Sequence, residues 1–476
     1  MKYTNQDKKI KNTSSDNKLN KKDYVHSNDG VRISQDWDQY GLPSFPISDS
    51  NIDLNIMKCG SSKDIPDSYY DLSHLACCSP DQGRRDFLMD AMAAGGLAAA
   101  FGLTLSQPAW SSILPPEDEI LKIGYLPITD ATILLTAHAM GFFEEEGIKA
   151  ERPTLIRGWS PLIEGFAAGK FNLVHFLKPI PLWMRYNNGF PVKIMSWAHI
   201  NGSGLVVGKH TGAKSFADLG GSQIAVPYWY SMHNIVLQMS LKNVGLIPVI
   251  KGESEEIAPN EVNLQVMPPP DMPPALASKK IDAFIVAEPF NAAGELLAGG
   301  TMLRFTGDIW KNHPCCVLCM NENTINQKPE WTQRVMNACV KAGLYAQENK
   351  KEVAKMLSKD GKKYLPMPAK VVERAMTFYD QDTYKNPNAI KNPDWKVGRI
   401  DFKPYPYPSA TKLIVKELSN TLVGGDKTFM ADLDADFVAN DLVNYSFIES
   451  SMAKYATPDN PDFNPEAFER EEVIAL

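Results

Sequence analysis

The chain has 476 residues, a length that suits roughly two to four domains or one large two-lobed body. Its 44% hydrophobic and 22% charged residues exclude a wholly disordered, collagen-like or coiled-coil protein. The net charge of −7 arises after residue 85, because the first 85 residues hold 12 basic and 12 acidic side chains. An acidic body argues against nucleic-acid binding, but it permits a local site for a small anion. Seven cysteines are too few for a disulfide-stapled scaffold.

The sequence of the amino-terminal region indicates an export signal. Residues 1–83 are rich in Lys, Asn, Asp and Ser and show no sustained period, so we expect a disordered extension. Residues 84–109 begin with Arg84 and Arg85, continue with Phe-Leu and a mildly apolar Ala/Gly stretch, and resemble a twin-arginine signal. Since no later run of about 20 apolar residues exists, the exported protein is expected to lack a membrane anchor.

The body alternates short apolar strands with amphipathic helices. A buried strand at residues 120–125 is followed by a helix that Gly141 closes. Such alternation predicts βαβ units and mostly parallel sheets. Further strands are expected at residues 149–155, 171–177, 192–197, 205–208, 223–227, 262–267 and 281–286, and helices at 160–168, 231–243, 272–279, 288–297 and 409–421, with a mainly helical region at 330–380.

Catalytic signatures are missing from the sequence. It contains no phosphate-binding P-loop, no G-x-G-x-x-G, no G-x-S-x-G and no H-E-x-x-H, and the eight histidines are scattered. Cys316 and Cys319 form a C-x-x-C, but they lie in an apolar stretch typical of a buried strand with inert thiols. The sequence therefore predicts no enzyme, no metal site and no cofactor.

Four segments carry a family resemblance. In chain order they read IGYLPITDA at residues 123–131, FNLVHF at 171–176, VMPPPDM at 266–272 with IDAFIVAEPFN at 281–291, and TGDIWKNHP at 306–314. In this order and spacing they resemble the nitrate/bicarbonate-binding proteins of ABC importers. The wider group includes binders of sulfonates and thiamine precursors.

This resemblance implies a type II periplasmic binding protein fold, an α/β architecture with two lobes and a ligand cleft between them. Lobe 1 is expected to comprise residues 118–208 and 305–456, lobe 2 residues 209–304, and a carboxyl-terminal tail residues 457–476. The implied function is capture of a small oxyanion such as nitrate, nitrite or bicarbonate in the periplasm. The monomeric protein delivers that ligand to a membrane permease and performs no catalysis.

A small oxyanion needs hydrogen-bond donors in a cleft that excludes water, and helix N-termini supply such donors. Predicted strand-to-helix turns place three such termini, at Thr129 and Asp130, at Trp159, and at Tyr228. By position, the resemblance assigns Trp159 and His233 to the ligand site and gives Glu288 a lobe-closing or supporting role. The full candidate set is Thr129, Asp130, Trp159, Lys178, Ser203, Tyr228, His233, Glu288 and Cys316.

The chain departs from the family pattern at two points. By the resemblance, Ser203 occupies a position that is glutamine in the nitrate and bicarbonate binders. After His313-Pro314 those binders carry a charged ligand residue, whereas this chain has Cys315-Cys316. Exchanging an ionic hydrogen bond for a thiol removes roughly 1.5–3 kcal/mol of binding free energy. Three alternatives therefore stay open: a binder of an organic sulfonate or aromatic heterocycle, a pyrimidine-precursor synthase-like or thiol enzyme, and a sensor.

Overall fold

A computed structural model of the chain describes residues 24–26, 32–34, 120–252, 254–455 and 469–476. The chain divides into two units, residues 1–46 and 47–476. In the first unit β1 (Tyr24–His26) pairs antiparallel with β2 (Arg32–Ser34). These six residues therefore form strands, whereas disorder was expected from the sequence. Runs of three residues are too short to show a period in the sequence. The rest of the predicted extension, and the signal-like segment 84–109, lie outside the described residues.

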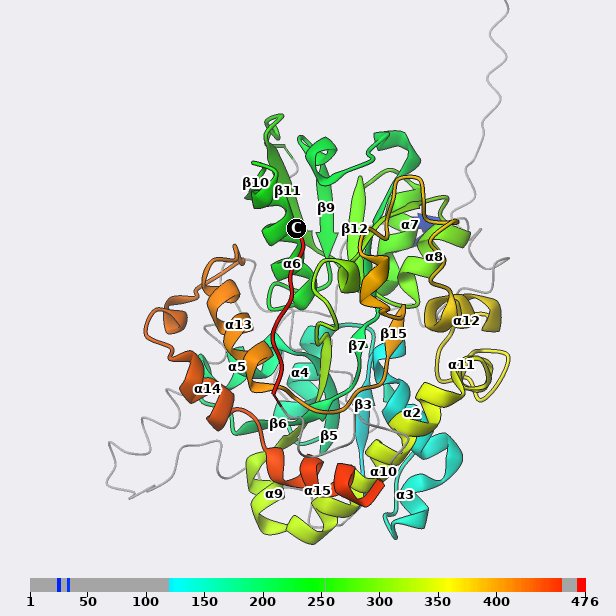
Figure 1. Ribbon diagram of the computed structural model, residues 1–476, viewed down its shortest axis with the longest axis vertical. Helices are drawn as coiled ribbons and strands as arrows, with labels where there is room; N and C mark the ends of the chain where they lie inside the picture. The colour runs from blue at the N-terminus through cyan, green and yellow to red at the C-terminus, as the bar shows by residue number, and fades with distance from the viewer. Residues whose placement is uncertain (1–23, 27–31, 35–119, 253, 456–468) are drawn as a thin grey trace, which may run out of the picture. The chain divides into compact units, whose positions relative to one another are not determined.

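The second unit contains two large sheets, which form the cores of two lobes (Figure 1). In the first lobe the strand order is β4 (Thr154–Leu155), β3 (Ile123–Tyr125), β5 (Leu173–Leu177), β14 (Cys316–Asn321) and β6 (Val192–Trp197). Strand β3 pairs parallel with β4 and β5, while β14 runs antiparallel between β5 and β6.

The second lobe is built on a six-stranded sheet. Its strand order is β10 (Ile247–Val249), β11 (Glu261–Val266), β9 (Gln223–Val226), β12 (Ala283–Ala287), β8 (Ser203–Val207) and β13 (Thr301–Phe305). β8 pairs antiparallel with both β12 and β13, whereas the other pairs are parallel. Both sheets are mixed, with five parallel and four antiparallel strand pairs between them, and the predicted two-lobed α/β fold is confirmed.

One predicted boundary was wrong. The strand at residues 205–208 was expected to close the first lobe, but β8 lies inside the sheet of the second lobe. Its five residues are all buried, and its apolar part, residues 205–207, is a short run that either sheet could accommodate. The second lobe begins at Ser203 rather than at residue 209.

Helices cover the sheets, and the predicted ones are present with shifted ends. The helical region at 330–380 contains three helices, and Gly141 ends the first long helix in the left-handed conformation with φ 78°. The helices are α2 (Thr132–Met140), α3 (Phe142–Glu145), α4 (Trp159–Ala167), α5 (Pro179–Tyr186), α6 (Met232–Asn243), α7 (Met272–Ala277), α8 (Phe290–Leu296), α9 (Glu322–Gln327), α10 (Pro329–Glu348), α11 (Lys350–Leu357), α12 (Ala369–Thr377), α13 (Pro408–Ser419), α14 (Ala435–Asp441) and α15 (Tyr445–Tyr455). Among the helices of the described residues, none has both the length and the apolar character needed to cross a bilayer.

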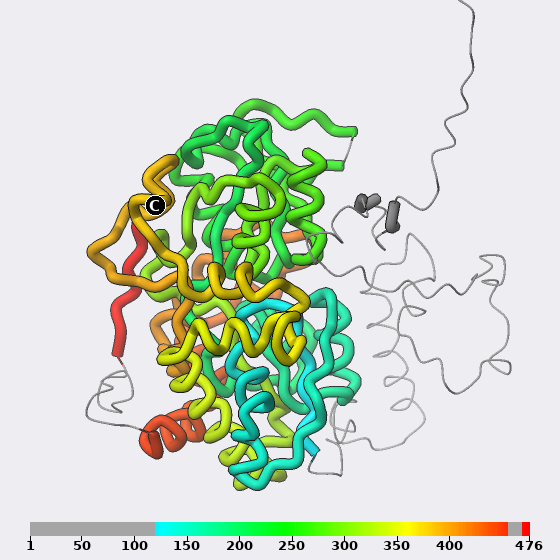
Figure 2. The backbone as a smooth tube through the Cα atoms, turned by 90° about the vertical axis from the view of Figure 1, so that its right-hand side faces the viewer, coloured from blue at the N-terminus to red at the C-terminus, as the bar shows by residue number. Residues whose placement is uncertain are grey.

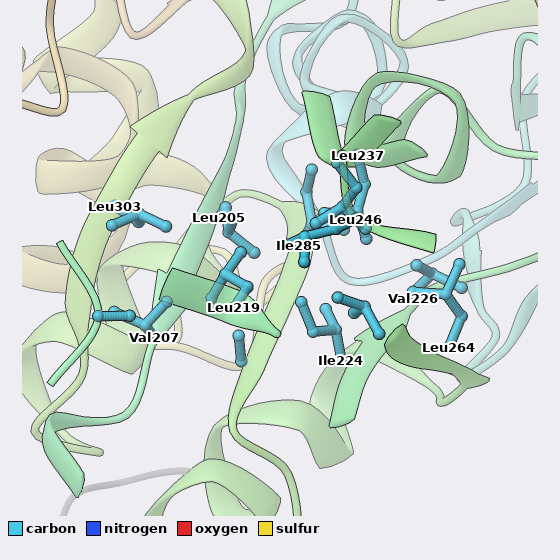
Figure 3. Packing of buried hydrophobic residues seen from close by; sticks show 14 residues of the cluster. Leu205, Val207, Leu219, Ile224, Val226, Leu237, Leu246, Leu264, Ile285 and Leu303 are labelled. Atoms are coloured by element: carbon cyan, nitrogen blue, oxygen red, sulfur yellow. The ribbon is translucent and has the colours of Figure 1, made fainter. Parts of the chain in front are cut away.

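The second lobe has a well-packed aliphatic core. Leu205 and Ile285 belong to paired strands, and Leu237 of α6 packs in the same cluster (Figure 3). Each of these side chains is fully buried. Burying a leucine or isoleucine stabilises the fold by roughly 1.5–3 kcal/mol, so this core fixes β8 and β12 relative to α6.

Two crossover segments connect the lobes and lie side by side. The first runs from β6 to β8 and the second from β13 to β14; Ile200 and Pro314 form an antiparallel bridge between them. The Asn201 amide donates to the His313 carbonyl oxygen at 2.9 Å. A third segment joins them, because β15 (Ile400–Asp401) pairs with β7 (Ile200–Asn201). In Figure 2 the green chain of the second lobe lies next to the cyan and yellow-green chain of the first.

The described end of the predicted carboxyl-terminal tail packs against the crossover region. Residues Trp310 and Ile474 form an isolated antiparallel bridge. The Trp310 indole donates to Glu472 Oε2 at 2.6 Å, and Ser409 of α13 donates to Glu472 Oε1 at 2.8 Å. Residues 469–476 are thus an integrated part of the fold.

Candidate functional site

The predicted site residues lie where strands end. Thr129 and Asp130 follow β3 in the short helix η5 (Thr129–Ala131), and Lys178 follows β5. In the other lobe Glu288 follows β12, and His233 is the second residue of α6, the helix after β9. Ligands of open α/β sheets bind at the carboxyl ends of strands, so these residues remain candidates for a ligand site.

Four buried side chains gather beside the crossovers. Asp130 Oδ2 lies 2.9 Å from His199 Nε2, 3.1 Å from Cys316 Sγ and 3.6 Å from Cys315 Sγ. All four side chains are fully buried, and one ligand-type atom from each lies within 4.8 Å of the others. We call this group the Asp–His–Cys–Cys cluster. Its donor set is one that holds metal ions in proteins, although the sequence had predicted no metal site.

Two predicted residues of the second lobe touch this cluster. Ser203 Oγ and His233 Nε2 share a hydrogen bond of 2.9 Å. Cys315 Sγ lies 3.5 Å from Ser203 Oγ and 3.8 Å from His233 Nε2. His233 stands in the first turn of α6, so the second lobe contacts the sulfur through the start of that helix. The structure therefore joins Asp130, Ser203, His233 and Cys316 through Cys315.

The Asp130–His199 pair holds protons tightly. Burial raises the pKa of the Asp130 carboxyl, and the nearby Cys315 adds to that rise, although His199 opposes it. Burial lowers the pKa of His199, but the Asp130 carboxylate and Cys315 outweigh it and raise that pKa to about 10. An imidazolium at this position balances negative charge within the cluster.

The two adjacent thiols differ in acidity. Burial raises the pKa of Cys315, but a hydrogen bond from Cys316 and the neighbouring His233 and His199 bring it well below its usual value. Burial, Cys315 and Asp130 all raise the pKa of Cys316 well above its usual value. The pair therefore shares one proton, held on Cys316, and Cys315 carries thiolate character.

Trp159 and His175 present a second kind of group, buried donors without acceptors. The Leu126 amide donates to His175 Nε2 at 2.9 Å, so the proton of the neutral ring is on Nδ1. Burial and the charge of His199 lower the pKa of His175 to about 3, which keeps the ring neutral. Neither His175 Nδ1 nor Trp159 Nε1 has a hydrogen-bond partner, and the two rings meet edge to face at 5.6 Å.

Glu288 is held by a buried cation. Arg399 Nε donates to Glu288 Oε1 at 2.6 Å, and the Ala292 amide donates to Glu288 Oε2 at 3.0 Å. Both charged side chains are fully buried. The carboxylate is thus neutralised within the protein, which removes much of the repulsion that an unpaired Glu288 would exert on an anion.

Lys178 and Tyr228 have different surroundings. The Lys178 ammonium is buried without a hydrogen bond and lies over the Trp197 ring, 5.1 Å from its centre. Burial lowers the pKa of Lys178 to about 7, although Glu472 raises it. Tyr228 is half-buried in the turn between β9 and α6.

Sequence reasoning missed His175, His199 and Cys315. His199 lies in a crossover with no motif around it, and His175 lies in a strand whose five residues are all buried, so neither carries a local signal. Cys315 did carry one, because it follows His313-Pro314, where the resemblance expects a ligand residue. Cys319 stays apart as predicted: it is a free thiol buried in β14, and burial raises its pKa.

The lobes, their paired crossovers and the polar groups at the strand ends define a two-lobed binding-protein fold of the periplasmic type. The nitrate-binding protein NrtA of Synechocystis PCC 6803, described as periplasmic, has this fold and superposes with a TM-score of 0.60 at 18% identity, covering 73% of this chain and 91% of that one.

Sequence comparison gives the family. The chain belongs to the NMT1-like family, whose model matches residues 114–358. It is 27% identical over 311 residues to the nitrate/nitrite binding protein NrtA of Nostoc sp. (strain PCC 7120), covering 60% of this chain and 67% of that protein. It is also 26% identical over 238 residues to the nitrate import ATP-binding protein NrtC of Synechocystis sp. (strain PCC 6803). That match covers 48% of this chain, which spans about a third (35%) of the length of NrtC.

Proposed function

We propose that this protein is an exported solute-binding protein that captures a small oxyanion between its lobes and delivers it to the membrane permease of an ABC importer. Nitrate, nitrite and bicarbonate are the favoured ligands. The protein works as a monomer in the periplasm, reaches it through the twin-arginine signal-like segment, and performs no chemical step on its ligand.

The observation that carries this proposal is the pair of buried donors on Trp159 and His175. Buried polar groups in native proteins nearly always have a hydrogen-bond partner. Leaving a buried N–H unpaired costs about 1–3 kcal/mol, so two such groups side by side favour an acceptor from outside the chain. A planar oxyanion offers several acceptor oxygens to such donors.

The electrostatics favour a small anion as that acceptor. Trp159 is the first residue of α4, a helix of nine residues, so the positive end of the helix dipole lies beside this residue. His175 is neutral, and the neighbouring His199 has a raised pKa and favours negative charge nearby. Donors and one cation suit an oxyanion better than a neutral solute.

The transport role rests on the family and its relatives. NrtA is named for nitrate and nitrite binding, and NrtC for nitrate import. A two-lobed binder that encloses its ligand presents a changed surface to a permease, which links capture to delivery.

Thermal unfolding of the full chain with added solutes tests the proposal. Ligand at a hundredfold excess over its dissociation constant stabilises the folded state by about 2.7 kcal/mol, which raises the melting temperature. We expect a rise with nitrate, nitrite or bicarbonate and none with chloride at equal ionic strength. If only methanesulfonate or an aromatic heterocycle raises the melting temperature, the ligand is an organic molecule and not a small inorganic oxyanion. No rise with any solute would overturn the binding function.

A further inference from the structure

We propose that the Asp–His–Cys–Cys cluster binds one zinc ion through Asp130 Oδ2, His199 Nε2, Cys315 Sγ and Cys316 Sγ. On binding, the ion replaces the one proton that the two thiols share and the proton on His199 Nε2, and both protons pass to the solvent. No electron transfer and no further reactant are needed. The site shares no residue with the oxyanion donors Trp159 and His175, and the metal can be tested without any anion.

The distances within the cluster suit a single ion. Zinc binds oxygen and nitrogen at about 2.0–2.2 Å and sulfur at about 2.3 Å in a tetrahedron, so neighbouring ligand atoms are roughly 3–4 Å apart. Asp130 Oδ2 lies 2.9, 3.1 and 3.6 Å from the atoms of His199, Cys316 and Cys315. All four atoms lie within 4.8 Å of one another, so small side-chain shifts bring them to one centre.

The imidazole of His199 provides an independent observation. Its side chain is fully buried, and its Nε2 forms an ion pair of 2.9 Å with Asp130 Oδ2. The N–H of that nitrogen is not aligned for a hydrogen bond to the carboxylate. A zinc ion bound by both atoms would take the place of the proton between them and hold the two side chains in one buried site.

The type of ligand selects zinc among the common metals. Two thiolates and an imidazole exclude the hard ions magnesium and calcium, which take oxygen ligands. The carboxylate of Asp130 disfavours copper(I), which prefers soft sulfur ligands. Zinc accepts sulfur, nitrogen and oxygen in one tetrahedral site.

The position of the ligands gives the ion a role at the junction of the lobes. His199 belongs to the first crossover and Cys315 to the second, while Asp130 and Cys316 belong to the first lobe. One ion thus ties both crossovers to the first lobe. Its charge lies where Cys315 touches Ser203 and His233 of the other lobe.

Cobalt(II) and zinc titrations of the full chain test the site. Cobalt(II) substitutes for zinc and reports thiolate ligation through a sulfur-to-metal charge-transfer band and tetrahedral coordination through intense visible bands. All proteins carry serine at the three early cysteines, so that these cannot bind the probe. Those three are Cys59, Cys77 and Cys78. We expect one cobalt per chain, displaced by one zinc.

The variants Cys316→Ser and His199→Gln are compared with the matched control Cys319→Ser, a buried thiol of the same strand outside the cluster. Losing a ligand is expected to weaken zinc binding at least about a hundredfold, since even supporting residues cost 10–100-fold. The control should bind as the parent does. Circular dichroism of each metal-free variant establishes that it is folded.

Each outcome decides the matter. Loss of the charge-transfer band in Cys316→Ser, loss of affinity in His199→Gln and retention in Cys319→Ser support the site. A parent that binds no cobalt or zinc, or folded ligand variants that bind as tightly as the parent, would overturn it. Because nitrate is absent throughout, failure here leaves the proposed oxyanion function standing, and failure of that function leaves the metal site standing.

Discussion

The backbone amide and the hydroxyl of Thr129 both donate hydrogen bonds to the carbonyl oxygen of Glu288, at 2.8 and 3.1 Å. Thr129 follows β3 of the first lobe and Glu288 follows β12 of the second. Both residues are fully buried. The two lobes therefore meet at the carboxyl ends of their strands, and the stability of this contact depends on what holds Glu288.

Glu288→Gln is predicted to destabilise the protein strongly. The substitution removes the charge that Arg399 faces at 2.6 Å and leaves a buried guanidinium with Glu295 as its remaining carboxylate partner. Breaking a buried ion pair on one side costs about 3–5 kcal/mol of unfolding free energy. Urea unfolding of the parent and the variant measures the difference.

The double variant Glu288→Gln, Arg399→Met is the control for this ion pair. Removing both charges leaves no unpaired buried ion, so the double variant should be more stable than Glu288→Gln alone. If it is less stable than the single variant by the full cost of the Arg399 change, the two side chains act independently and the ion pair does not hold the lobe contact.

Trp159→Phe is predicted to weaken oxyanion binding at least about tenfold. The change keeps an aromatic ring against His175 but removes the unpartnered indole donor. A hydrogen bond to a charged group is worth about 1.5–3 kcal/mol, and 1.4 kcal/mol is a factor of ten in affinity, so about tenfold is the smallest loss expected. Calorimetric titration with nitrate measures it, with Trp183→Phe as the control because Trp183 stacks on Tyr230. Equal weakening in both variants would contradict the assignment.

The sequence predicted where helices and strands begin and end better than it predicted which strands pair in a sheet. The strand at 192–197 has the predicted ends because Val192–Trp197 combines β-branched and aromatic residues that pack between β14 and the helices. Likewise, the helix end at Gly141 followed from the left-handed conformation that glycine accepts. β8 was misplaced because the short apolar run at residues 205–207 does not reveal which sheet it joins.

The candidate site was only partly predictable for a related reason. Asp130, Ser203, His233 and Cys316 were found from strand ends and from the resemblance, since these are local features of the chain. His199 meets Asp130 only because the first crossover returns past the end of β3, a tertiary contact that no spacing records. Sequence patterns therefore located the region of the site, and three-dimensional packing determined which side chains share it.

Glu472→Ala is predicted to lower the unfolding free energy by about 1.5–3 kcal/mol. The carboxylate accepts hydrogen bonds from the Trp310 indole and the Ser409 hydroxyl and pairs with Arg470. One hydrogen bond to a charged group contributes about that much, and the loss of the acceptor of the fully buried indole dominates because the half-buried Ser409 and Arg470 can turn to water. Glu471→Ala, at an exposed neighbour, is the matched control for chemical denaturation and should change stability little. Equal effects of the two variants would mean that residues 469–476 do not brace the fold.

Lys178→Met is predicted to raise stability at neutral pH and to flatten its dependence on pH. The pKa of Lys178 is about 7 in the folded protein, mainly because of burial, and about 10.4 in an unfolded chain. Below pH 7 both states are protonated, and the folded state bears the full penalty of a buried ammonium. Between about pH 7 and 10 the unfolded state holds more protons, so the unfolding free energy of the parent rises with pH. The variant removes this rise and should be more stable than the parent by more than about 1 kcal/mol at pH 6, the difference shrinking toward pH 10. Urea unfolding at pH 6, 8 and 10 checks it, and a parent whose stability does not increase over this range relative to Lys178→Met would show that the ammonium is solvated.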